Sequence, residues 1–134
     1  MFRLTSIESV MEHVADFQTL SYTIIEDVGM PSCLLPDMAD ASFLRCDFAG
    51  ATMPDNLENG LFVDCRMGGL SFTQANLFNA RFVRCDLSHS RSLDCDLSAV
   101  QFEGCALATT EFSNCDPETT EIAGGDCGGS SVAA

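Results

Sequence analysis

The sequence contains no lysine and no tryptophan, and it contains only two histidines. Six arginines are its only permanently cationic side chains, against 20 aspartates and glutamates, and the formal net charge is −14. Binding to DNA or RNA depends on Lys and Arg side chains that displace counterions, so this balance argues against direct nucleic-acid binding. It argues equally against docking on an anionic membrane surface. A basic protein partner, or imitation of a polyanion, is compatible with it.

No targeting or membrane-spanning segment is predicted from the sequence either. No stretch approaches 18 uncharged apolar residues, so no transmembrane helix is predicted. The first residues run directly into Glu8 and Glu12 without an apolar core, so no secretory signal is predicted. We therefore expect a cytoplasmic protein that does not bind membranes. Eight cysteines in a small chain are typical of secreted disulfide scaffolds, but in a cytoplasmic protein they are expected to be reduced thiols.

The sequence lacks the motifs of common catalytic and cofactor sites. It has no G-x-x-x-x-G-K-S/T loop, no G-x-G-x-x-G after a strand, no H-E-x-x-H and no C-x-x-C pair. His13 and His89 are far apart, and neither has a nearby Ser or Cys nucleophile with a supporting acid. We therefore expect a protein that is not an enzyme, with no catalytic residues, no cofactor and no metal.

A five-residue period is the strongest positive signal. From Gly60 onward, the third position of each five is large and apolar except at Ser92 and Pro117, and the first position is small except at Leu70. The third-position residues are Phe62, Met67, Phe72, Leu77, Phe82, Leu87, Ser92, Leu97, Phe102, Leu107, Phe112, Pro117 and Ile122. The first-position residues are Gly60, Cys65, Leu70, Ala75, Ala80, Cys85, Ser90, Cys95, Val100, Cys105, Thr110, Cys115 and Thr120.

A period of five fits neither a helix face nor a strand face, which repeat in steps of three to four and of two. Within each five, positions one and three can both point inward from a short extended piece, while the second position points outward. The remaining two residues can then turn a corner. This pattern predicts a chain that coils around its own axis, with the large third-position side chains at the centre.

The pattern resembles the pentapeptide-repeat family, whose consensus is similar to A-(D/N)-L-x-x. The best matches are Cys46-Asp47-Phe48-Ala49-Gly50, Ala75-Asn76-Leu77-Phe78-Asn79, Cys85-Asp86-Leu87-Ser88-His89 and Cys95-Asp96-Leu97-Ser98-Ala99. The resemblance covers roughly residues 41–124. It implies an all-β solenoid, a right-handed quadrilateral β-helix with four fives per coil, and thus about four coils.

One irregular corner is predicted in residues 54–60. Upstream of it, Phe43, Phe48 and Met53 keep the five-residue spacing, but Phe62 follows Met53 after nine residues instead of ten. One four-residue side, 55–58, would bring Phe43 into the column of Phe62 and Cys46 into the column of Cys65. Residues 31–40 are expected to form a degenerate first coil.

The ends of a solenoid need caps. Thr5 and Glu8 form a capping box, and Ile7, Val10, Met11, Val14 and Phe17 recur at helical spacing. We predict a cap over residues 1–30, with an amphipathic helix over 6–19 and a strand over 20–25, followed by the repeat domain over 31–124. Residues 125–134 are predicted to be a flexible Gly/Ser-rich tail, so the last coil could serve as an end-to-end homodimer surface.

The cysteines align at twenty-residue intervals on two faces. Cys46, Cys65, Cys85 and Cys105 form one column, and Cys95 and Cys115 form another. A metal ladder or a redox switch is one interpretation. The favoured interpretation is that these thiols are small apolar fillers beside the central side chains.

Two surface features remain as candidate functional sites. The side with Leu57, Leu77 and Leu97 carries acids and no Arg, and a second side has apolar residues at outward positions, a feature typical of an interaction surface. The acidic strip is Glu58, Asp96, Asp116 and Glu118, and the apolar patch is Leu44, Leu61, Val63 and Val83. The patch is expected to be covered either by the protein's own N-terminal helix or by another protein.

Two functions are consistent with these features. The first is a non-enzymatic protein-interaction module, such as a scaffold, adaptor or effector. The second is implied by the family resemblance: some pentapeptide-repeat proteins are acidic rods that imitate DNA, bind type II topoisomerases such as DNA gyrase and protect cells from quinolones. A continuous acidic strip would favour the mimic, and an uncovered apolar patch would favour the interaction module.

Overall fold

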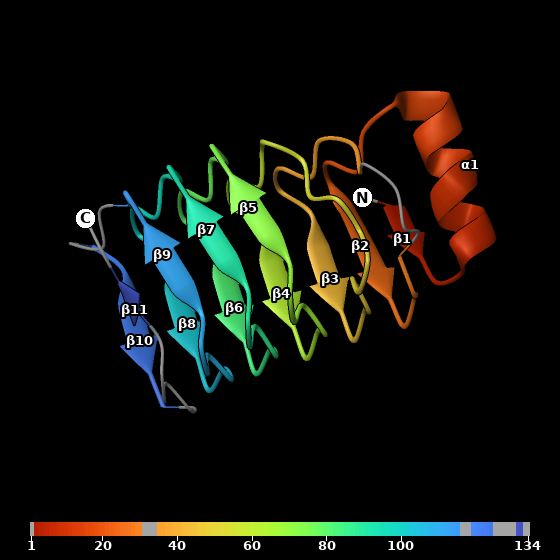
Figure 1. Ribbon diagram of the computed structural model, residues 1–134. Helices are drawn as coiled ribbons and strands as arrows, with labels where there is room; N and C mark the ends of the chain where they lie inside the picture. The colour runs from red at the N-terminus through yellow and green to blue at the C-terminus, as the bar shows by residue number, and fades with distance from the viewer. Residues whose placement is uncertain (1, 31–34, 116–118, 125–130, 133–134) are drawn as a thin grey trace.

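The chain winds into a short four-sided rod with one helix at its N-terminal end (Figure 1). This computed structural model describes residues 2–30, 35–115, 119–124 and 131–132. The strands pair in parallel with strands of the next coil, as a continuous solenoid requires. The fold is the right-handed quadrilateral β-helix that the resemblance to the pentapeptide-repeat family implied.

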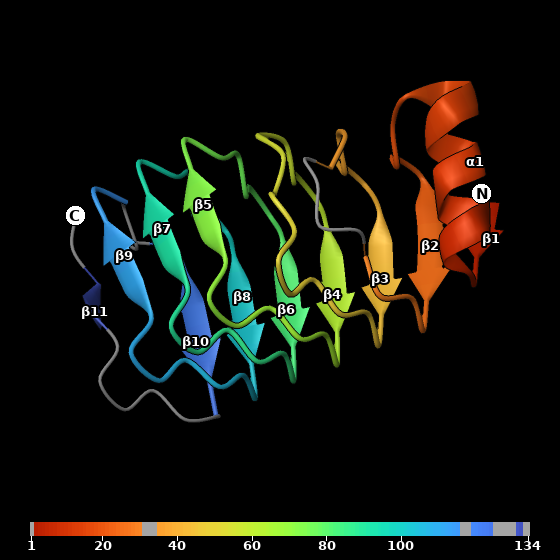
Figure 2. The ribbon, with the colours of Figure 1, turned by 45° about the vertical axis from the view of Figure 1, so that its right-hand side comes forward.

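A seven-stranded parallel sheet forms one side of the rod (Figures 1 and 2). Its strands, in spatial order, are β1 (Phe2–Leu4), β2 (Thr23–Glu26), β3 (Ser42–Leu44), β4 (Leu61–Val63), β6 (Arg81–Val83), β8 (Gln101–Glu103) and β10 (Glu121–Ala123). In β3, β4, β6 and β8 the middle residue points into the rod and the flanking residues point outward. In β1 and β2 the inward residues of this column are Leu4 and Ile25.

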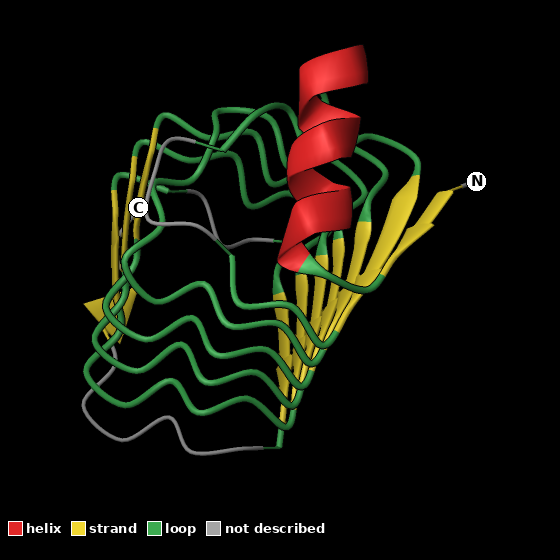
Figure 3. Cartoon of the chain, turned by 90° about the vertical axis from the view of Figure 1, so that its right-hand side faces the viewer, coloured by secondary structure: helices red, strands yellow, loops and turns green. Residues whose placement is uncertain are grey.

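A four-stranded sheet lies across the rod from the seven-stranded one (Figure 3). Its strands are β5 (Ser71–Thr73), β7 (Arg91–Leu93), β9 (Glu111–Ser113) and β11 (Ser131–Val132). The other two sides are connected by single parallel bridges such as Asp47 with Arg66 and Asn76 with Asp96. Of the tail predicted over residues 125–134, the structure describes only β11, which pairs with β9.

The third-position side chains fill the centre of the rod in vertical columns. Phe43, Phe62, Phe82 and Phe102 lie one above another with nearly parallel rings and centroid distances of 4.9–5.1 Å. Each of the four is at most 4% exposed. Their burial removes large apolar surfaces from water, at roughly 25 cal/mol per Å², and this column is the main element of the core.

The corners follow two residues after each central side chain, where the backbone adopts a positive φ. At the corner beside the seven-stranded sheet the residues are Asp27, Arg45, Asp64, Arg84, Gly104 and Gly124, with φ between 51° and 80° as at the other corners. Non-glycine residues adopt this region at a cost of about 1–2 kcal/mol each. The short extended sides and the buried column hold them there.

The coils differ in length on the N-terminal side of the rod. Phe43 pairs with Phe62, and Ile25 pairs with Phe43, so these coils have 19 and 18 residues, whereas Phe62 pairs with Phe82 at the regular 20. Met53 and Leu57 are both buried central residues only four positions apart. The shorter side therefore lies between them, inside the predicted irregular region.

The number of coils predicted from the repeat, about four, is too low. Strands β1 and β2 belong to the same sheet as the repeat strands, so six turns separate β1 from β10. Leu4 and Ile25 occupy the central column above Phe43 and are 7% and 0% exposed. These N-terminal coils lack a regular five-residue spacing because a helix is inserted into the first of them.

The N-terminal helix is shorter than predicted. Helix α1 spans Ile7–Phe17, and its N-cap is Ser6, whose hydroxyl accepts a hydrogen bond from the Ser9 backbone N–H at 3.1 Å. The Ser9 hydroxyl in turn accepts from the Ser6 N–H, so the capping box is Ser6–Ser9 and the predicted Thr5–Glu8 box is wrong. Gln18, with φ of 58°, ends the helix. The strand predicted over 20–25 forms as β2, over Thr23–Glu26.

Helix α1 lies across the N-terminal end of the rod (Figures 1 and 3). Val10, 1% exposed, belongs to the core and Val14 packs against it. His13 is also buried, with 6% of its surface exposed. In the described part of the chain, no helix is long and apolar enough to cross a membrane.

Candidate functional site

The outward face of the seven-stranded sheet carries a ladder of apolar side chains. Leu44, Val63 and Val83 occupy the same outward position on β3, β4 and β6, in direct register. All three are half-buried, because each packs against the next along the sheet. We call these three residues the apolar ladder.

Leu61, the fourth residue of the predicted patch, lies on the same face but in the neighbouring column. It is in register with Ser42 on one side and Arg81 on the other, and it is also half-buried. The structure therefore brings the predicted patch together on three adjacent strands, as a ladder with one flanking leucine.

Ion pairs surround the apolar ladder. At the corner beside it, Arg45 donates to Asp27 through Nε (2.7 Å) and Nη2 (3.2 Å), and Arg84 donates to Asp64 at 2.9 and 3.2 Å. On the sheet itself, Arg81 pairs with Glu103 at 2.9 Å. An apolar strip with a charged rim is typical of protein-interaction surfaces, which have an apolar centre and a polar periphery.

The two bidentate pairs shift the titration of their carboxylates. The hydrogen bond from Arg45 lowers the pKa of Asp27, and the hydrogen bond from Arg84 lowers the pKa of Asp64. Both carboxylates therefore stay charged in mildly acidic solution. The corner beside the apolar ladder keeps its alternating order of acid and base along the rod.

Helix α1 does not cover the apolar ladder. It packs across the end of the rod, next to β1, rather than over β3, β4 and β6 (Figure 2). The expectation that the protein's own helix shields this face is therefore wrong. The helix faces the end because Val10 completes the core there, where the first coil would otherwise leave its apolar cross-section exposed.

The predicted acidic strip is not continuous. Glu58 and Asp96 lie on the same side of the rod but two coils apart, and Asp116 and Glu118 lie outside the described residues. The coil between them presents Asn76, which bridges Asn56 and Asp96, and the 41% exposed Phe78. A neutral and partly apolar coil therefore interrupts the negative charge.

Every arginine of the chain is paired with a carboxylate one coil away. The pairs are Arg3–Glu26, Arg45–Asp27, Arg66–Asp47, Arg81–Glu103, Arg84–Asp64 and Arg91–Glu111. The sequence contains no lysine. The positive charges are thus neutralised by pairs within the molecule. The unpaired acids determine the electrostatic potential around it.

The six cysteines among the described residues are buried free thiols. In the first column each Sγ donates to the carbonyl oxygen of the central residue one coil earlier, at 3.1–3.4 Å. Thr110 and Thr120 donate equivalently through their hydroxyls, to Leu87 and Leu97 at 2.8 Å. The first position therefore takes a small residue that can also donate a hydrogen bond, and a structural role accounts for these thiols.

Burial opposes the ionisation of these thiols, whereas hydrogen bonds with neighbouring thiols lower the pKa of Cys46 and of Cys85. Burial raises the pKa of Cys95 to about 11. Hydrogen bonds with neighbouring thiols, together with burial, raise the pKa of Cys65 and of Cys105. In the ranges that the structure describes, His, Cys, Asp and Glu side chains form no group of three that could hold a metal ion.

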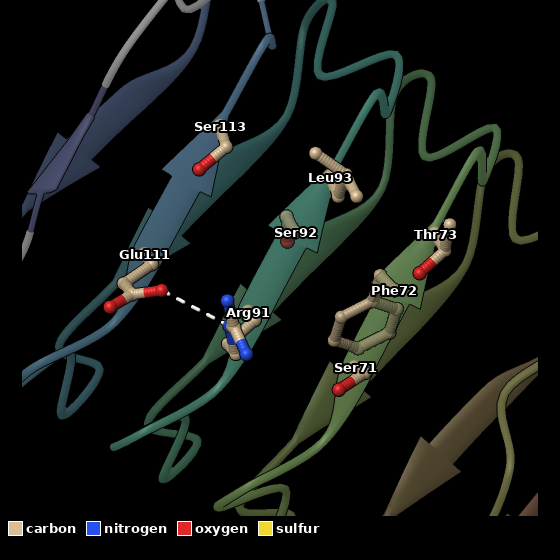
Figure 4. Close-up of a pocket in the computed structure, with 8 residues that line it drawn as sticks. All are labelled: Ser71, Phe72, Thr73, Arg91, Ser92, Leu93, Glu111 and Ser113. Atoms are coloured by element: carbon tan, nitrogen blue, oxygen red, sulfur yellow. Dashed lines mark hydrogen bonds and ion pairs between the residues drawn. The ribbon is translucent and has the colours of Figure 1, made fainter.

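A hollow of about 190 Å³ lies on the four-stranded sheet (Figure 4). Ser92 occupies a central position between Phe72 and Phe112, where the column otherwise holds large side chains. Arg91 crosses the hollow to pair with Glu111 at 3.1 Å. The hollow lies over the outward side chains of β5, β7 and β9, whereas Ser92 points into the rod, and the lining side chains do not form a recognisable catalytic arrangement.

A family model described as a pentapeptide repeat region matches residues 36–112 and 56–131. The chain belongs to the pentapeptide-repeat family. The matched residues include the whole of the apolar ladder. No curated protein sequence matches the chain significantly.

Solved pentapeptide-repeat structures resemble the chain at low sequence identity. Full-length QnrB1, a plasmid-mediated fluoroquinolone resistance protein, is 12% identical over 98% of this chain and 92% of its own, with a TM-score of 0.42. Rfr23 from the cyanobacterium Cyanothece 51142 is 13% identical, with a TM-score of 0.35, over 82% of this chain. The aligned part is 64% of the Rfr23 chain. HetL from Nostoc sp. strain PCC 7120, involved in heterocyst differentiation regulation, is 13% identical over 84% of this chain and 73% of its own, with a TM-score of 0.22.

Sequence reasoning missed one surface. Five large apolar side chains are exposed near the N-terminus, although the helical stripe was expected to pack on the solenoid. They are Phe2, Ile7, Met11, Phe17 and Tyr22. The signal was present in the width of the stripe, since Met11 directly follows Val10 and lies about 100° around the helix from it, too far for one contact surface to bury both.

Proposed function

We propose that this protein is a non-enzymatic protein-interaction module, a scaffold, adaptor or effector, that binds its partner through the apolar ladder. One observation supports this most directly: Leu44, Val63 and Val83 align on three consecutive coils and are left uncovered by α1. Their half-buried side chains gain further burial when a partner excludes water from them. We propose a cytoplasmic location for this interaction.

The ladder is suited to a partner with a flat apolar surface. Neighbouring strands lie about 4.8 Å apart, so the ladder presents side chains at regular, closely spaced positions on a rigid sheet. The rim of ion pairs would orient the partner without adding much affinity, because exposed pairs contribute little individually. Specific partners bury about 800 Å² on each side, so the contact would extend to Leu61 and the neighbouring coils.

A pair of charge substitutions tests the ladder. Val63→Asp with Val83→Asp should abolish capture of the partner from a native lysate, because the two carboxylates would have to be desolvated at the centre of the contact. The matched control is Thr73→Asp with Leu93→Asp, which adds the same charge to exposed positions in register on the opposite sheet. Capture is compared by pull-down and mass spectrometry, and folding by circular dichroism.

Two outcomes would contradict the proposal. Partner capture that persists in the folded Val63→Asp, Val83→Asp variant would mean that another surface binds. Equal loss in the control variant would mean that added negative charge, rather than its position, prevents binding.

The alternative function is imitation of DNA toward a type II topoisomerase such as DNA gyrase. Two observations support it. The arginines are paired within the molecule. The side with Leu57, Leu77 and Leu97 carries acids and no base. The neutral coil with Asn76 and Phe78 argues against it. In a gyrase supercoiling assay with and without a quinolone, we expect neither inhibition nor protection. Either effect would favour the mimic over the interaction module.

A further inference from the structure

The N-terminal end of the rod carries a cleft lined mainly by aromatic rings. Its walls are the first strand, the helix and the turn before β2, and its volume is about 200 Å³. The residues that line it are Phe2, His13, Phe17, Thr19, Ser21 and Tyr22. This cleft lies at the end of the rod and shares no residue with the apolar ladder.

The rings of the cleft support one another but remain open to solvent. The Phe2 and Phe17 centroids are 5.2 Å apart, and His13 lies 4.6 Å from Phe17 and 4.8 Å from Phe2. Yet Phe2 is 51%, Phe17 52% and Tyr22 63% exposed. Such exposure of three adjacent aromatic side chains is unusual on a protein surface in contact with water, and it indicates a binding site.

His13 provides an independent observation. Its side chain is 94% buried, given its 6% exposure, and lines the cleft. No hydrogen bond joins a ring nitrogen to another described residue, and neither nitrogen is fully buried, because no described side chain has a buried polar atom without a partner. Because an imidazole carries both a donor and an acceptor when neutral, it offers an unfilled hydrogen bond at the base of the cleft.

The helix that forms one wall of the cleft carries two exposed acids. Glu12 and Asp16 are exposed on α1, one turn apart, and Asp16 lies three residues from His13, on the adjoining helical turn. The sequence has no Lys or Arg between Arg3 and Arg45, and both of these arginines are paired with carboxylates at the start of the rod. Negative potential around the cleft disfavours an acidic occupant, and it disfavours a second copy of this chain for the same reason.

We propose that this cleft binds a basic segment of a partner protein. An aromatic or aliphatic anchor of the segment enters between Phe2, Phe17 and Tyr22. A neighbouring lysine or arginine reaches Glu12 and Asp16, and its cation also lies near the aromatic faces, where it is attracted to them. The His13 imidazole forms a hydrogen bond with the backbone or a polar group of the segment.

Two end-blocked peptides of equal length serve as probes with the full-length protein. Gly-Lys-Phe-Lys-Gly should shift the amide signals of β1, α1 and the turn before β2 in NMR titrations. Gly-Glu-Phe-Glu-Gly should bind at least about tenfold more weakly, because its charges repel Glu12 and Asp16. A third peptide, Gly-Lys-Gly-Lys-Gly, lacks the anchor and should also bind more weakly.

Variants of exposed residues separate the contributions. Phe17→Ala should weaken binding of the lysine peptide several-fold, whereas Phe78→Ala, another exposed phenylalanine far from the cleft, should leave it unchanged. Glu12→Gln with Asp16→Asn should weaken binding and reduce its salt dependence. The Val63→Asp, Val83→Asp variant should bind the peptide normally, so a failure of the apolar ladder and a failure of the cleft are distinguishable.

Three results would overturn the proposal. Equal affinity for the lysine and glutamate peptides would remove the role of charge. Signal shifts confined to residues outside the cleft would place the peptide elsewhere. Self-association by the wild-type protein, lost in Phe17→Ala on size-exclusion chromatography with light scattering, would assign the cleft to a second copy of the chain.

Discussion

At the scale of single residues, the position within the five decides what a side chain does, more than its chemical type. Phe78 and Phe82 are four residues apart and chemically identical. Phe82 is 2% exposed and stacked between Phe62 and Phe102 at 4.9 and 5.1 Å, whereas Phe78 follows a central leucine and is 41% exposed. The first belongs to the core of the rod, and the second belongs to its surface.

This contrast yields a stability prediction. Phe82→Ala should lower the free energy of unfolding by about 3–5 kcal/mol, because it removes a ring from the centre of a stacked column and leaves a cavity. Phe78→Ala should change it by no more than about 0.5 kcal/mol. Urea denaturation followed by circular dichroism measures both. Similar losses in the two variants would mean that the phenylalanine column does not hold the rod together.

At the scale of elements, the corner beside the apolar ladder alternates acid and base along the rod: Asp27, Arg45, Asp64 and Arg84. These side chains project from residues with positive φ, so successive coils bring them directly above one another. Because the arginines lower the pKa of Asp27 and Asp64, the folded state binds protons at these carboxylates less readily than the unfolded chain. The stabilisation is present above the ordinary carboxyl pKa of about 3.9 and is lost as the pH falls through the lower folded values.

The resulting prediction concerns the pH dependence of the melting temperature. The Arg45→Gln, Arg84→Gln variant should melt below the wild type at pH 7, and the difference should shrink as the pH is lowered from about 5 to 3, where the carboxylates protonate. Arg66→Gln is the control, because its pair with Asp47 is the longest of the six, with 4.0 Å between the guanidinium nitrogen and the carboxylate oxygen. Thermal unfolding at a series of pH values measures the effect. A difference that stayed constant down to pH 3 would show that the two arginines act through packing instead.

Regular elements were predictable from the sequence, and irregular ones were not. The columns around Phe62 and Phe82 follow from a strict five-residue period, and the change of register before them follows from the nine-residue step between Met53 and Phe62. Leu4 and Ile25 occupy the same column, but their coils have 21 and 18 residues. No constant period connects them, so the first two coils could not be recognised as part of the solenoid.

The candidate site was predictable only in part for a related reason. The alternation of inward and outward positions placed Leu44, Val63 and Val83 on one face. What covers that face depends on where α1 docks, which is a tertiary contact of Val10 with the end of the core. The N-terminal cleft depends on the same docking, since it brings His13 and Phe17 of the helix to Phe2 of β1. Helical spacing alone does not reveal which side of a wide apolar stripe stays exposed.

At the scale of the whole molecule, the balance of charge should govern stability. All six arginines are committed to pairs between coils, and the net charge of −14 remains as mutual repulsion among the other acids. Added salt weakens both the pairs and the repulsion. Exposed pairs are individually weak, whereas the repulsion acts across a rod with a large charge excess, so screening of the repulsion should dominate.

We therefore expect the melting temperature at pH 7 to rise as sodium chloride is increased from about 10 to 150 mM, over which the screening length falls from about 30 to 8 Å. Near the calculated isoelectric point of 4.1 the rise should disappear, because the net charge that causes the repulsion is then close to zero. Thermal unfolding at the two pH values, at matched ionic strengths, makes the comparison and separates screening from general effects of salt on hydration. A fall in melting temperature with salt at pH 7 would mean that the arginine–carboxylate pairs stabilise the rod more than the repulsion among the acids destabilises it.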